Sequence, residues 1–481
     1  MLRRRSASSR WPGLLALGAL SLAAGLALAA FFARPRLIAS APAAGLTDVS
    51  PRARLHLTFD RPMDPASVEA ALRTEPAVPG DFIWDTAGQT VTFRPAAAWP
   101  VLSPVTVTLA GGRSRAGLPV LEREQWSFTV GQERLVYLTA GVPNVALLSL
   151  AEGAAPELLT AEPYGVIDFT LHPDTGQIVY AARRADGGAD LRLVSPDGAE
   201  HADLLPCPEA ACLAARFSPD GTRLAYERQT PLVGAQGVAG FGDPRVHVYT
   251  LATGADQALG DPGNQARAPQ WSPDGRVSFY DTARQALVVV NPDTGAVTYV
   301  PATSGEAGTW SPDGQRLVYA EIVFLDNAIT LTGTLAVTDN VPINVAGFYS
   351  HLFQVTVATN AAVDLSASSG GGPGVVEDAS PVYSLDGAWL AFGRKPLQGA
   401  TWTPGRQLWL MRADGSEARP LTAEPPYNHS AFAWNPDSQR LAYMRLDATD
   451  PNALAEIWLI HVDGSGARRL VAGGFSPEWL P

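Results

Sequence analysis

The sequence contains little cysteine and lysine, and none of the short motifs that mark the common classes of enzyme. Two of its 481 residues are cysteine, and Lys395 is its single lysine, so arginine carries nearly all of the positive charge. It has no Gly-x-Ser-x-Gly elbow, no His-Glu-x-x-His motif and no Walker loop. These absences argue against an α/β-hydrolase, a zinc protease of that type and a P-loop nucleotidase. We expect no catalytic residue, no cofactor and no metal site.

Basic residues are also scarce in most of the chain. The net charge is −12, from 47 acidic and 35 basic residues. Residues 1–38 hold six of the basic residues and no acidic one, so residues 39–481 carry 29 basic against 47 acidic residues, a net charge of −18. Binding to nucleic acid needs clustered basic side chains that displace the counterions of the phosphates. We therefore expect no nucleic-acid partner.

The N-terminal region predicts a place in the cell envelope. Four arginines lie within residues 1–10, and the 23 residues from 11 to 33 carry no charge. A helix of that length rises about 34 Å, which is enough to cross a bilayer. The excess of arginine before it favours a cytoplasmic tail at 1–10, a transmembrane anchor at 11–33 and an extracytoplasmic body. The alternative is a secreted protein whose signal peptide is cleaved, since Ala27-Leu28-Ala29 has the form of a cleavage site.

The two cysteines, Cys207 and Cys212, lie five residues apart in the segment CPEAAC. In an exported protein such a pair can close a small surface loop with a disulfide. Two thiolates without a nearby histidine or second cysteine pair would leave a tetrahedral zinc ion half-ligated. The disulfide is therefore the favoured interpretation, while free thiols and a metal site remain alternatives.

Residues 39–131 alternate between apolar and polar positions in short segments. The runs RLHLTF (54–59), QTVTF (89–93), VTVTL (105–109) and WSFTV (126–130) are each bounded by turn-forming residues, as in β-strands. One helix is predicted in DPASVEAAL (64–72), where Asp64 can cap the helix and Pro65 takes the first helical position. Several short strands within about 90 residues predict a β-sandwich.

The landmarks of this segment occur in a recognisable order. LTFDRPMDPASVEAAL is followed by EPAVPGDFIWD, QTVTFRP and a closing WSFTV. In this order they resemble the bacterial Ig-like domain of surface-layer and other envelope proteins. The resemblance covers residues 39–131 and implies a spacer or adhesive module.

One phrase, an aromatic residue followed by Ser-Pro-Asp-Gly, returns through the rest of the chain at intervals of roughly 51 residues. Such a period indicates a propeller, a solenoid or an array. Each interval also contains further β-rich runs and a second turn, and four short strands per unit are typical of a propeller blade. The copies are LHPDTGQIVY (171–180), FSPDGTRLAY (217–226), WSPDGRVSFY (271–280), WSPDGQRLVY (310–319), YSLDGAWLAF (383–392), WNPDSQRLAY (434–443) and a truncated FSPEW (475–479).

The phrase has a mechanical explanation. Proline sets φ for the first corner of a type I turn, aspartate accepts backbone N–H groups, and glycine takes the left-handed conformation that returns the chain. The preceding aromatic residue has the bulk to fill the wedge between neighbouring blades. We expect these positions to be structural; the aromatic residues are Phe217, Trp271, Trp310, Tyr383 and Trp434.

The truncated last copy, in which Glu478 replaces the aspartate, predicts closure of a ring. The segment 133–159 reads as three strands of a blade without a preceding phrase, and the C-terminal segment supplies the missing strand. Closure would bury strand edges that otherwise invite aggregation. Residues 132–481 resemble TolB-type propellers, which carry the same phrase, and seven copies predict seven blades, with six as the alternative. The resemblance predicts the fold but leaves the function open, because such propellers bind proteins, gate peptidases or act as lyases.

Two segments interrupt the regular repeat. The unit from 310 to 365 is overlong, and residues around 324–353 predict an extended hairpin standing off one face of the ring. The run SASSGGGPG (366–374) predicts a flexible connector.

A second recurrence suggests a binding site. The sequences LLTAEPYG (158–165) and PLTAEPPYNH (420–429) both precede a predicted innermost strand. Loops at this position surround the opening of a propeller's axial channel, where converging polar groups on apolar walls can bind a ligand. The alternative is that the loops resemble each other only because blades duplicate. The candidate residues for this mouth are Glu162, Tyr164, Arg267, Glu377, Asp378, Glu424, Tyr427, Asn428 and His429.

The sequence thus predicts an all-β protein of the cell membrane that binds an envelope protein or a glycan without catalysis. One alternative is a polysaccharide lyase or hydrolase acting at the axial channel, although the seven histidines are scattered along the chain. The other alternative is a structural component of a surface layer.

Overall fold

The computed structural model places two compact units, one ending at Gln132 and the other spanning Glu133–Pro481. The expected membrane anchor at 11–33 lies outside the described residues except for residue 33. Among the residues that are described, no helix is long and apolar enough to cross a membrane. The all-β prediction is confirmed. The structure describes residues 33–234, 237–261, 263, 265–324, 348–370, 375–397 and 402–481.

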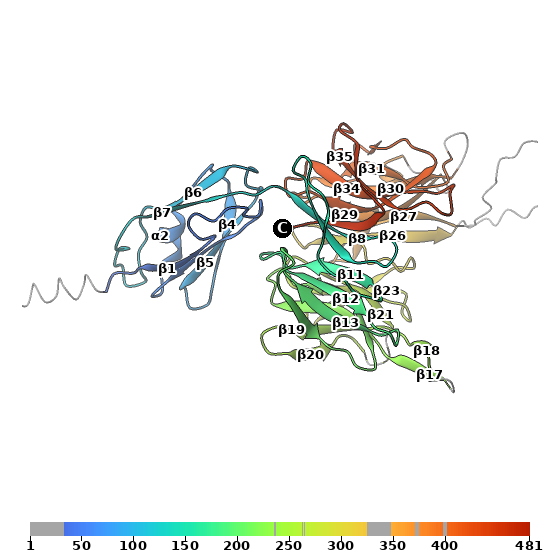
Figure 1. Ribbon diagram of the computed structural model, residues 1–481, viewed down its shortest axis with the longest axis horizontal. Helices are drawn as coiled ribbons and strands as arrows, with labels where there is room; N and C mark the ends of the chain where they lie inside the picture. Colours follow the sequence, from blue (N-terminus) through green and yellow to red (C-terminus); the bar gives the residue numbers. More distant parts are fainter. Residues whose placement is uncertain are drawn as a thin grey trace, which may run out of the picture. The chain divides into compact units, whose positions relative to one another are not determined.

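The first unit consists of two antiparallel sheets (Figure 1, blue to teal). Its strands alternate between buried and exposed side chains, as in β2, because one face of each sheet meets the other sheet. One sheet has the order β1 (Leu37–Ala41), β2 (Leu55–Phe59), β5 (Thr90–Pro95), β4 (Gly80–Trp84), and the other has the order β3 (Leu72–Glu75), β6 (Pro104–Leu109), β7 (Glu124–Thr129).

The inner faces of these sheets form a single apolar core. Trp99 is 1% exposed and lies between the rings of Phe93 and Phe128, with centroids 6.4 and 6.2 Å away. The predicted helix is shorter than expected, because α2 covers only Pro65–Glu69. Asp64 holds the N-cap position, but its side chain makes no capping hydrogen bond, so the expected carboxylate cap is wrong. Instead, the hydroxyl of Ser67 donates to the Asp64 carbonyl at 2.8 Å.

The second unit repeats one four-stranded antiparallel sheet. Within residues 133–481, as far as the structure describes them, the strands form seven such groups, two of which are joined edge to edge. The first three groups, each given from its innermost strand outward, are β37 (Gly474–Trp479), β8 (Arg134–Thr139), β9 (Val145–Ser149), β10 (Glu157–Leu158); β11 (Val166–Leu171), β12 (Ile178–Arg183), β13 (Ala189–Val194), β14 (His201–Leu205); and β15 (Ala211–Phe217), β16 (Arg223–Gln229), β19 (Arg245–Thr250), β20 (Ala255–Ala258).

The remaining groups follow the same order along the chain. They are β21 (Ala266–Trp271), β22 (Val277–Asp281), β23 (Ala286–Val290), β24 (Val297–Pro301); β25 (Thr309–Trp310), β26 (Arg316–Phe324), β27 (Phe348–Thr356), β28 (Ala361–Asp364); β29 (Val376–Tyr383), β30 (Trp389–Pro396), β31 (Gln407–Arg412), β32 (Arg419–Pro420); and β33 (Tyr427–Trp434), β34 (Arg440–Asp447), β35 (Glu456–His461), β36 (Arg468–Ala472). We number these sheets 1 to 7, beginning with the one that contains β37.

The sheets form a closed ring. The first strands of neighbouring sheets contact one another, as β11 does β15 and β33 does β37, whereas outer strands such as β20 are exposed. Separate apolar clusters lie between consecutive sheets, and one more lies between sheets 7 and 1. The C-terminal strand β37 pairs with β8, in register from Gly474↔Thr139 to Trp479↔Leu135. The first and last strands of this unit therefore complete the ring, as the truncated phrase predicts.

The repeated phrase acts as expected in its turns and between the sheets. In the fifth sheet, the Asp313 carboxylate accepts the Ser311 hydroxyl at 2.5 Å and the Gln315 backbone N–H at 2.9 Å. Tryptophans at the ends of inner strands bridge to the preceding sheet: Trp271 donates to the Arg216 carbonyl at 3.0 Å, and Trp479 to the Ala433 carbonyl at 3.0 Å. The aromatic residues thus join neighbouring sheets by both packing and hydrogen bonds.

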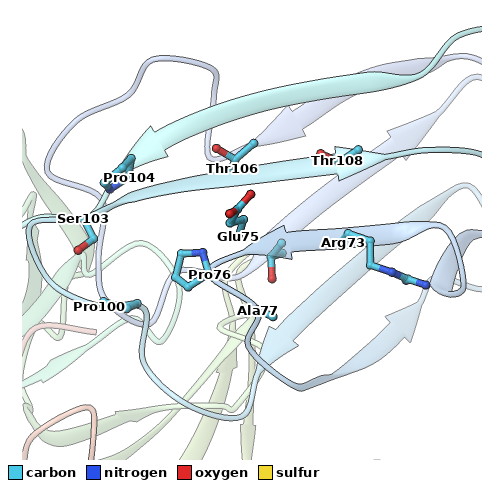
Figure 2. A pocket seen from close by; sticks show the side chains of 10 residues that line it. Arg73, Glu75, Pro76, Ala77, Pro100, Ser103, Pro104, Thr106 and Thr108 are labelled. Carbon is cyan, nitrogen blue, oxygen red and sulfur yellow. The ribbon is translucent and has the colours of Figure 1, made fainter.

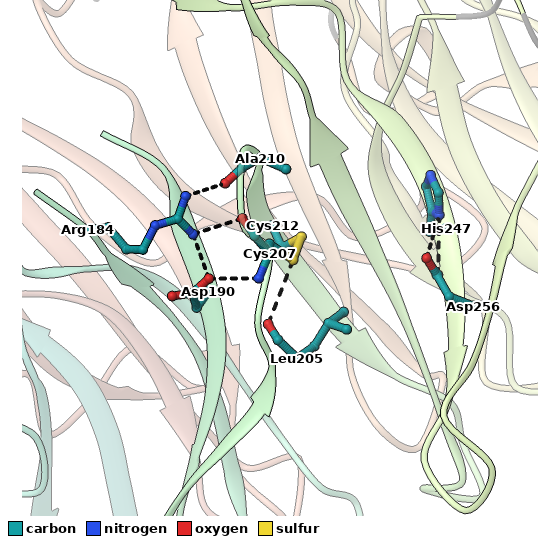
Figure 3. The surroundings of a disulfide bond; sticks show 8 residues. All are labelled: Arg184, Asp190, Leu205, Cys207, Ala210, Cys212, His247 and Asp256. Carbon is teal, nitrogen blue, oxygen red and sulfur yellow. Dashed lines mark hydrogen bonds and ion pairs between the residues drawn. A yellow bond between two sulfur atoms is a disulfide. The ribbon is translucent and has the colours of Figure 1, made fainter. Parts of the chain in front are cut away.

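A disulfide joins Cys207, in the loop after β14, to Cys212 near the start of β15. Figure 3 shows Arg184 beside this loop, where it donates to the carbonyls of Cys207 at 2.9 Å and Ala210 at 3.0 Å. Asp190 accepts from Arg184 and from the Cys207 N–H at 2.8 Å. Both cysteines are fully buried, so the disulfide lies in the packed seam between sheets 2 and 3.

Two hairpins and a short helix depart from the regular pattern. Strands β17 (Pro231–Gly234) and β18 (Gly237–Phe241) form a separate hairpin. Strands β26 and β27 pair out to Phe324↔Phe348, as expected for the extended hairpin, while residues 325–347 lie outside the described residues. The predicted connector at 366–374 is partly wrong, because α3 (Leu365–Ser368) buries Ser366, and residues 371–374 are not described.

Candidate binding cavity on the ring

The Thr-Ala-Glu-Pro loop before β11 is held by the start of the neighbouring strand β9. The Asn144 side-chain carbonyl accepts the Thr160 hydroxyl at 2.9 Å and the Glu162 N–H at 2.7 Å. The Glu162 carboxylate then accepts from Arg192 at 2.8 Å and from the Tyr180 hydroxyl at 3.0 Å. Glu162 is therefore a packing residue of sheet 2, and Tyr164 beside it is 54% exposed.

The loop before β33 uses the same arrangement. The Gln407 side-chain carbonyl accepts the Glu424 N–H at 2.8 Å, and the Glu424 carboxylate accepts from Arg445 at 2.8 Å. The Arg445 guanidinium lies between the rings of Tyr427 and Trp458, 4.0 and 3.8 Å from their centroids. The two similar sequences thus share a loop clasp and a glutamate–arginine ion pair, and in the second loop the arginine also stacks on two rings.

Asp378 and His429, which we expected at a channel mouth, are instead buried inside the wall of the ring. The Asp378 carboxylate is fully buried and accepts from Arg394 at 2.6 and 2.7 Å and from the Ser366 hydroxyl at 2.6 Å. His429 is 1% exposed, and its Nδ1 lies 3.0 Å from the Arg406 carbonyl. Burial lowers the pKa of His429 below its usual value, which favours the neutral imidazole.

Arg406 links sheets 6 and 7. Its guanidinium pairs with Glu377, and its backbone N–H donates to the Asn428 side chain at 3.0 Å. Its Nε is buried without a hydrogen-bond partner among the described residues. Of the residues predicted for one mouth, Glu377, Glu424, Tyr427, Asn428 and His429 are thus brought together through Arg406 and Arg445. The structure does not bring Glu162, Tyr164 and Arg267 to this network: they lie in sheets 2 and 4, and Glu162 pairs with Arg192 of its own sheet.

A cavity of about 330 Å³ opens beside this network, between sheets 5 and 6. Its polar lining comes from the loop before β25, from β27, from β29 and from the start of β31: Ser304, Glu306, Ser350, Glu377 and Arg406. Its walls are otherwise apolar, formed by Ala320, Ile322, Phe348, Tyr349, Ala379 and Leu397. A few polar groups that converge on apolar walls are the usual form of a ligand site.

Glu306 belongs to a repeated structural feature that sequence reasoning missed. Inner strands bulge at a residue with positive φ, namely Ala214, Ala268 and Ser380 (φ 53°, 54° and 54°). The N–H of each bulged residue donates to a carboxylate of the preceding sheet or loop: Asp168 at 2.8 Å, Glu227 at 2.6 Å and Glu306 at 3.2 Å. Only the pairing of distant segments places these acids, so no local motif marks them.

The carboxylates near the junction of sheets 1, 2 and 3 are strongly affected by burial. Burial raises the pKa of Glu478 to about 7, and Asp168 adds to this increase while Arg216 opposes it. Burial likewise raises the pKa of Asp168 and of Glu227. The described residues contain no group of three histidine, cysteine or acidic side chains that could hold a metal ion.

Arg267, the remaining predicted residue, lies on β21 with its guanidinium 5.4 Å from the ring centroid of Tyr280. A Cβ on Gly305 would lie 2.4 Å from Arg267 Nη2, so this side chain packs on the loop that carries Glu306. Arg267 therefore lies next to the cavity loop without lining the cavity.

The first unit carries an open groove of about 950 Å³ on the outer face of β3 and β6. Figure 2 shows Glu75 near Thr106, with Arg73 at one end of the groove and Pro100 and Pro104 at the other. These polar side chains lie side by side along a flat sheet face. Because they do not converge, we place the candidate site on the ring.

Comparisons with known proteins agree with this division of the chain. Residues 33–130 match the family model of the bacterial Ig-like domain. No curated protein matches the chain in sequence.

Several solved structures are similar to the chain. TolB from Acinetobacter baumannii is 12% identical, with 85% of this chain and 83% of that chain covered and a TM-score of 0.40. An oligogalacturonate lyase from Vibrio parahaemolyticus is 14% identical, with 64% and 73% covered and a TM-score of 0.39. The β-propeller domain of the trilobed protease from Pyrococcus furiosus is 8% identical, with 78% and 94% covered and a TM-score of 0.43. These similarities say nothing about what the chain binds.

Proposed function

We propose that this chain is a membrane-anchored binding protein of the cell envelope, in which a seven-bladed propeller recognises an envelope protein or a glycan without catalysis. The proposed order is a cytoplasmic tail at 1–10, a membrane helix at 11–33, the Ig-like domain at 39–131 as a spacer, and the propeller at 132–481. The observation that carries the proposal is the cavity between sheets 5 and 6, where Glu306, Glu377 and Arg406 meet apolar walls.

The disulfide supports a location outside the cytoplasm. Disulfides form and persist in oxidising compartments and are rare in the cytosol. The bond between Cys207 and Cys212 lies fully buried in the seam between two sheets, where it is part of the packed structure. Protease treatment of intact spheroplasts tests the location: we expect digestion of the ring from outside and protection of an epitope placed before residue 11.

Recovery of partners from membranes tests the binding function. The full chain, tagged at its N-terminus, is cross-linked in native membranes and purified. A cavity-filling variant, Ser304→Trp, is treated in the same way in a separate preparation. A matched variant, Ser465→Trp, places the same ring in an exposed turn on sheet 7. We expect a protein or glycan to be recovered with the wild type and with S465W, and to be lost with S304W. Recovery of nothing above background from the wild type would contradict the proposal.

The same preparations separate binding from the two alternatives. A lyase or hydrolase would convert polysaccharides supplied with divalent cations, and this turnover would fall in His429→Ala. A surface-layer component would assemble with itself and recover only its own chain. Either result would replace the proposed binding function.

A further inference from the structure

We propose that the cavity between sheets 5 and 6 takes the cationic end of a lysine or arginine side chain of a protein partner, with Glu306 as its counter-charge. This inference rests on the proposed binding function and names the chemistry of the partner at that site. It follows from the pairing of charges in the cavity, from the nature of its walls and from the charge of the whole body.

Within the part of the chain that the structure describes, the Glu306 carboxylate lines the cavity without an ion pair. Its carboxylate accepts the Ser380 N–H at 3.2 Å, and it forms no ion pair with any residue that the structure describes. Four acids of the neighbouring networks each form an ion pair: Glu162 with Arg192, Glu377 with Arg406, Asp378 with Arg394 and Glu424 with Arg445.

The charges that line the cavity favour a cation over an anion. Glu306 and Glu377 contribute two carboxylates against the single guanidinium of Arg406, which already pairs with Glu377. A cation entering the cavity finds a carboxylate with free acceptor capacity at Glu306. An anion would instead have to compete with Glu377 for Arg406 while facing the negative charge of Glu306.

The walls suit the methylene stem of a basic side chain. Ile322 and Leu397 line the cavity together with Phe348. Phe348 is 50% exposed, and its ring centroid lies 6.4 Å from that of Phe324. Lysine and arginine bury an apolar stem while their charged end finds a polar partner. An exposed aromatic face also attracts a cation. The volume of about 330 Å³ is at the small end of ligand sites, which favours one inserted side chain over an oligosaccharide.

The charge of the whole body favours the same partner. Residues 39–481 carry a net charge of −18. A negative field of this kind speeds the approach of basic partners and slows that of acidic ones. The local and the long-range electrostatics therefore agree.

The test measures binding of short peptides to the full chain in lipid nanodiscs by isothermal titration and ligand-observed NMR. The probes are Gly-Gly-Lys-Gly-Gly and its norleucine analogue, which keeps the stem and lacks the ammonium group. We expect the lysine peptide to bind about tenfold more tightly than the norleucine peptide. Glu306→Gln is expected to remove this difference, while Glu157→Gln, an exposed glutamate of sheet 1, leaves it unchanged.

A salt series on the wild type gives a second measurement that needs no variant. Between about 20 and 500 mM NaCl, the affinity of the lysine peptide is expected to fall several-fold, and that of the norleucine peptide to stay constant. Equal affinities for the two peptides, an E306Q protein that still prefers lysine, or no salt dependence would each overturn the inference. Tighter binding of a neutral oligosaccharide that E306Q does not weaken would assign the cavity to glycans instead.

The outcomes for this inference and for the binding function are separable. A partner that is recovered from membranes but not displaced by the lysine peptide or lost with E306Q leaves the binding function standing and overturns the inference. If the lysine peptide binds specifically through Glu306 but no partner is recovered from membranes, the inference stands and the proposed binding function is overturned.

Discussion

Replacing Trp479 with alanine tests whether the C-terminal strand closes the ring. Trp479 ends β37 and is 8% exposed, within an apolar cluster that includes Leu135 of the same sheet and Ile457 of sheet 7. Its indole N–H donates to the Ala433 carbonyl of sheet 7 at 3.0 Å. The side chain therefore joins the first and last sheets by packing and by a hydrogen bond.

The expected loss of stability follows from these contacts. Truncating a buried tryptophan to alanine costs about 3–5 kcal/mol, from the lost burial of apolar surface and from the cavity that remains. The lost indole hydrogen bond contributes about 1 kcal/mol to that total. Because the seam between sheets 7 and 1 is held by noncovalent contacts, we expect a decrease of about 4 kcal/mol in the unfolding free energy of the ring.

The assay is urea unfolding of the full chain in detergent, followed by circular dichroism, with hydrogen exchange measured on the peptide that covers β8. Trp402→Ala is the matched control, since Trp402 is 38% exposed and the Lys395 ammonium lies 5.5 Å from its ring centroid in a cation–π pair. We expect the control to cost less than about 1 kcal/mol. Equal losses in the two variants, with unchanged exchange at residues 134–139, would refute closure through β37.

Three further perturbations test other parts of the ring. The free energy of unfolding of the double variant C207S/C212S should be about 2 kcal/mol lower than that of the wild type, because its short loop is no longer closed in the unfolded chain. A reductant that lowers the melting temperature of the double variant as much as that of the wild type would contradict this. Asp378→Asn leaves Arg394 buried without its counter-charge and should cost about 3–5 kcal/mol in urea unfolding; a loss below about 1 kcal/mol would show that the pair is dispensable. Because burial raises the pKa of folded Glu478 to about 7, above the ordinary 4.5, the folded state keeps a proton that the unfolded chain releases. Wild-type stability should therefore fall by up to about 3 kcal/mol as the pH rises from about 4.5 to about 7, and E478Q should fall less over that range; parallel pH profiles would exclude Glu478 as the source.

The comparison of the two Thr-Ala-Glu-Pro loops shows where sequence reasoning reaches its limit. Their similarity is real, but its cause is the clasp that Asn144 and Gln407 form with the backbone and threonine of each loop. The spacing of residues in a loop does not determine whether a carboxylate faces a channel or a neighbouring strand. The structure directs Glu162 and Glu424 toward arginines of their own sheets.

The connector near residue 366 illustrates the same limit. A run rich in serine and glycine predicts flexibility, yet α3 starts this segment and Ser366 is buried, donating to the Asp378 carboxylate at 2.6 Å. Composition cannot reveal that a serine of the run completes the hydrogen bonds of a buried ion pair. Satisfying a buried charge overrides the local preference.

The sequence by itself determined the repeating unit, its turns, the aromatic residues between sheets and the closure by the last strand. These features depend on contacts within one phrase or on its regular return, so they can be recognised along the chain. Only the tertiary structure decided which acids acquire an arginine and which are buried deeply enough to shift in pKa. It also decided that Glu306 lines a cavity without an ion pair to any residue that the structure describes. Glu306 and Ser380 are 74 residues apart, and such meetings are set by how the sheets curve around a common axis, which no local pattern of residues records.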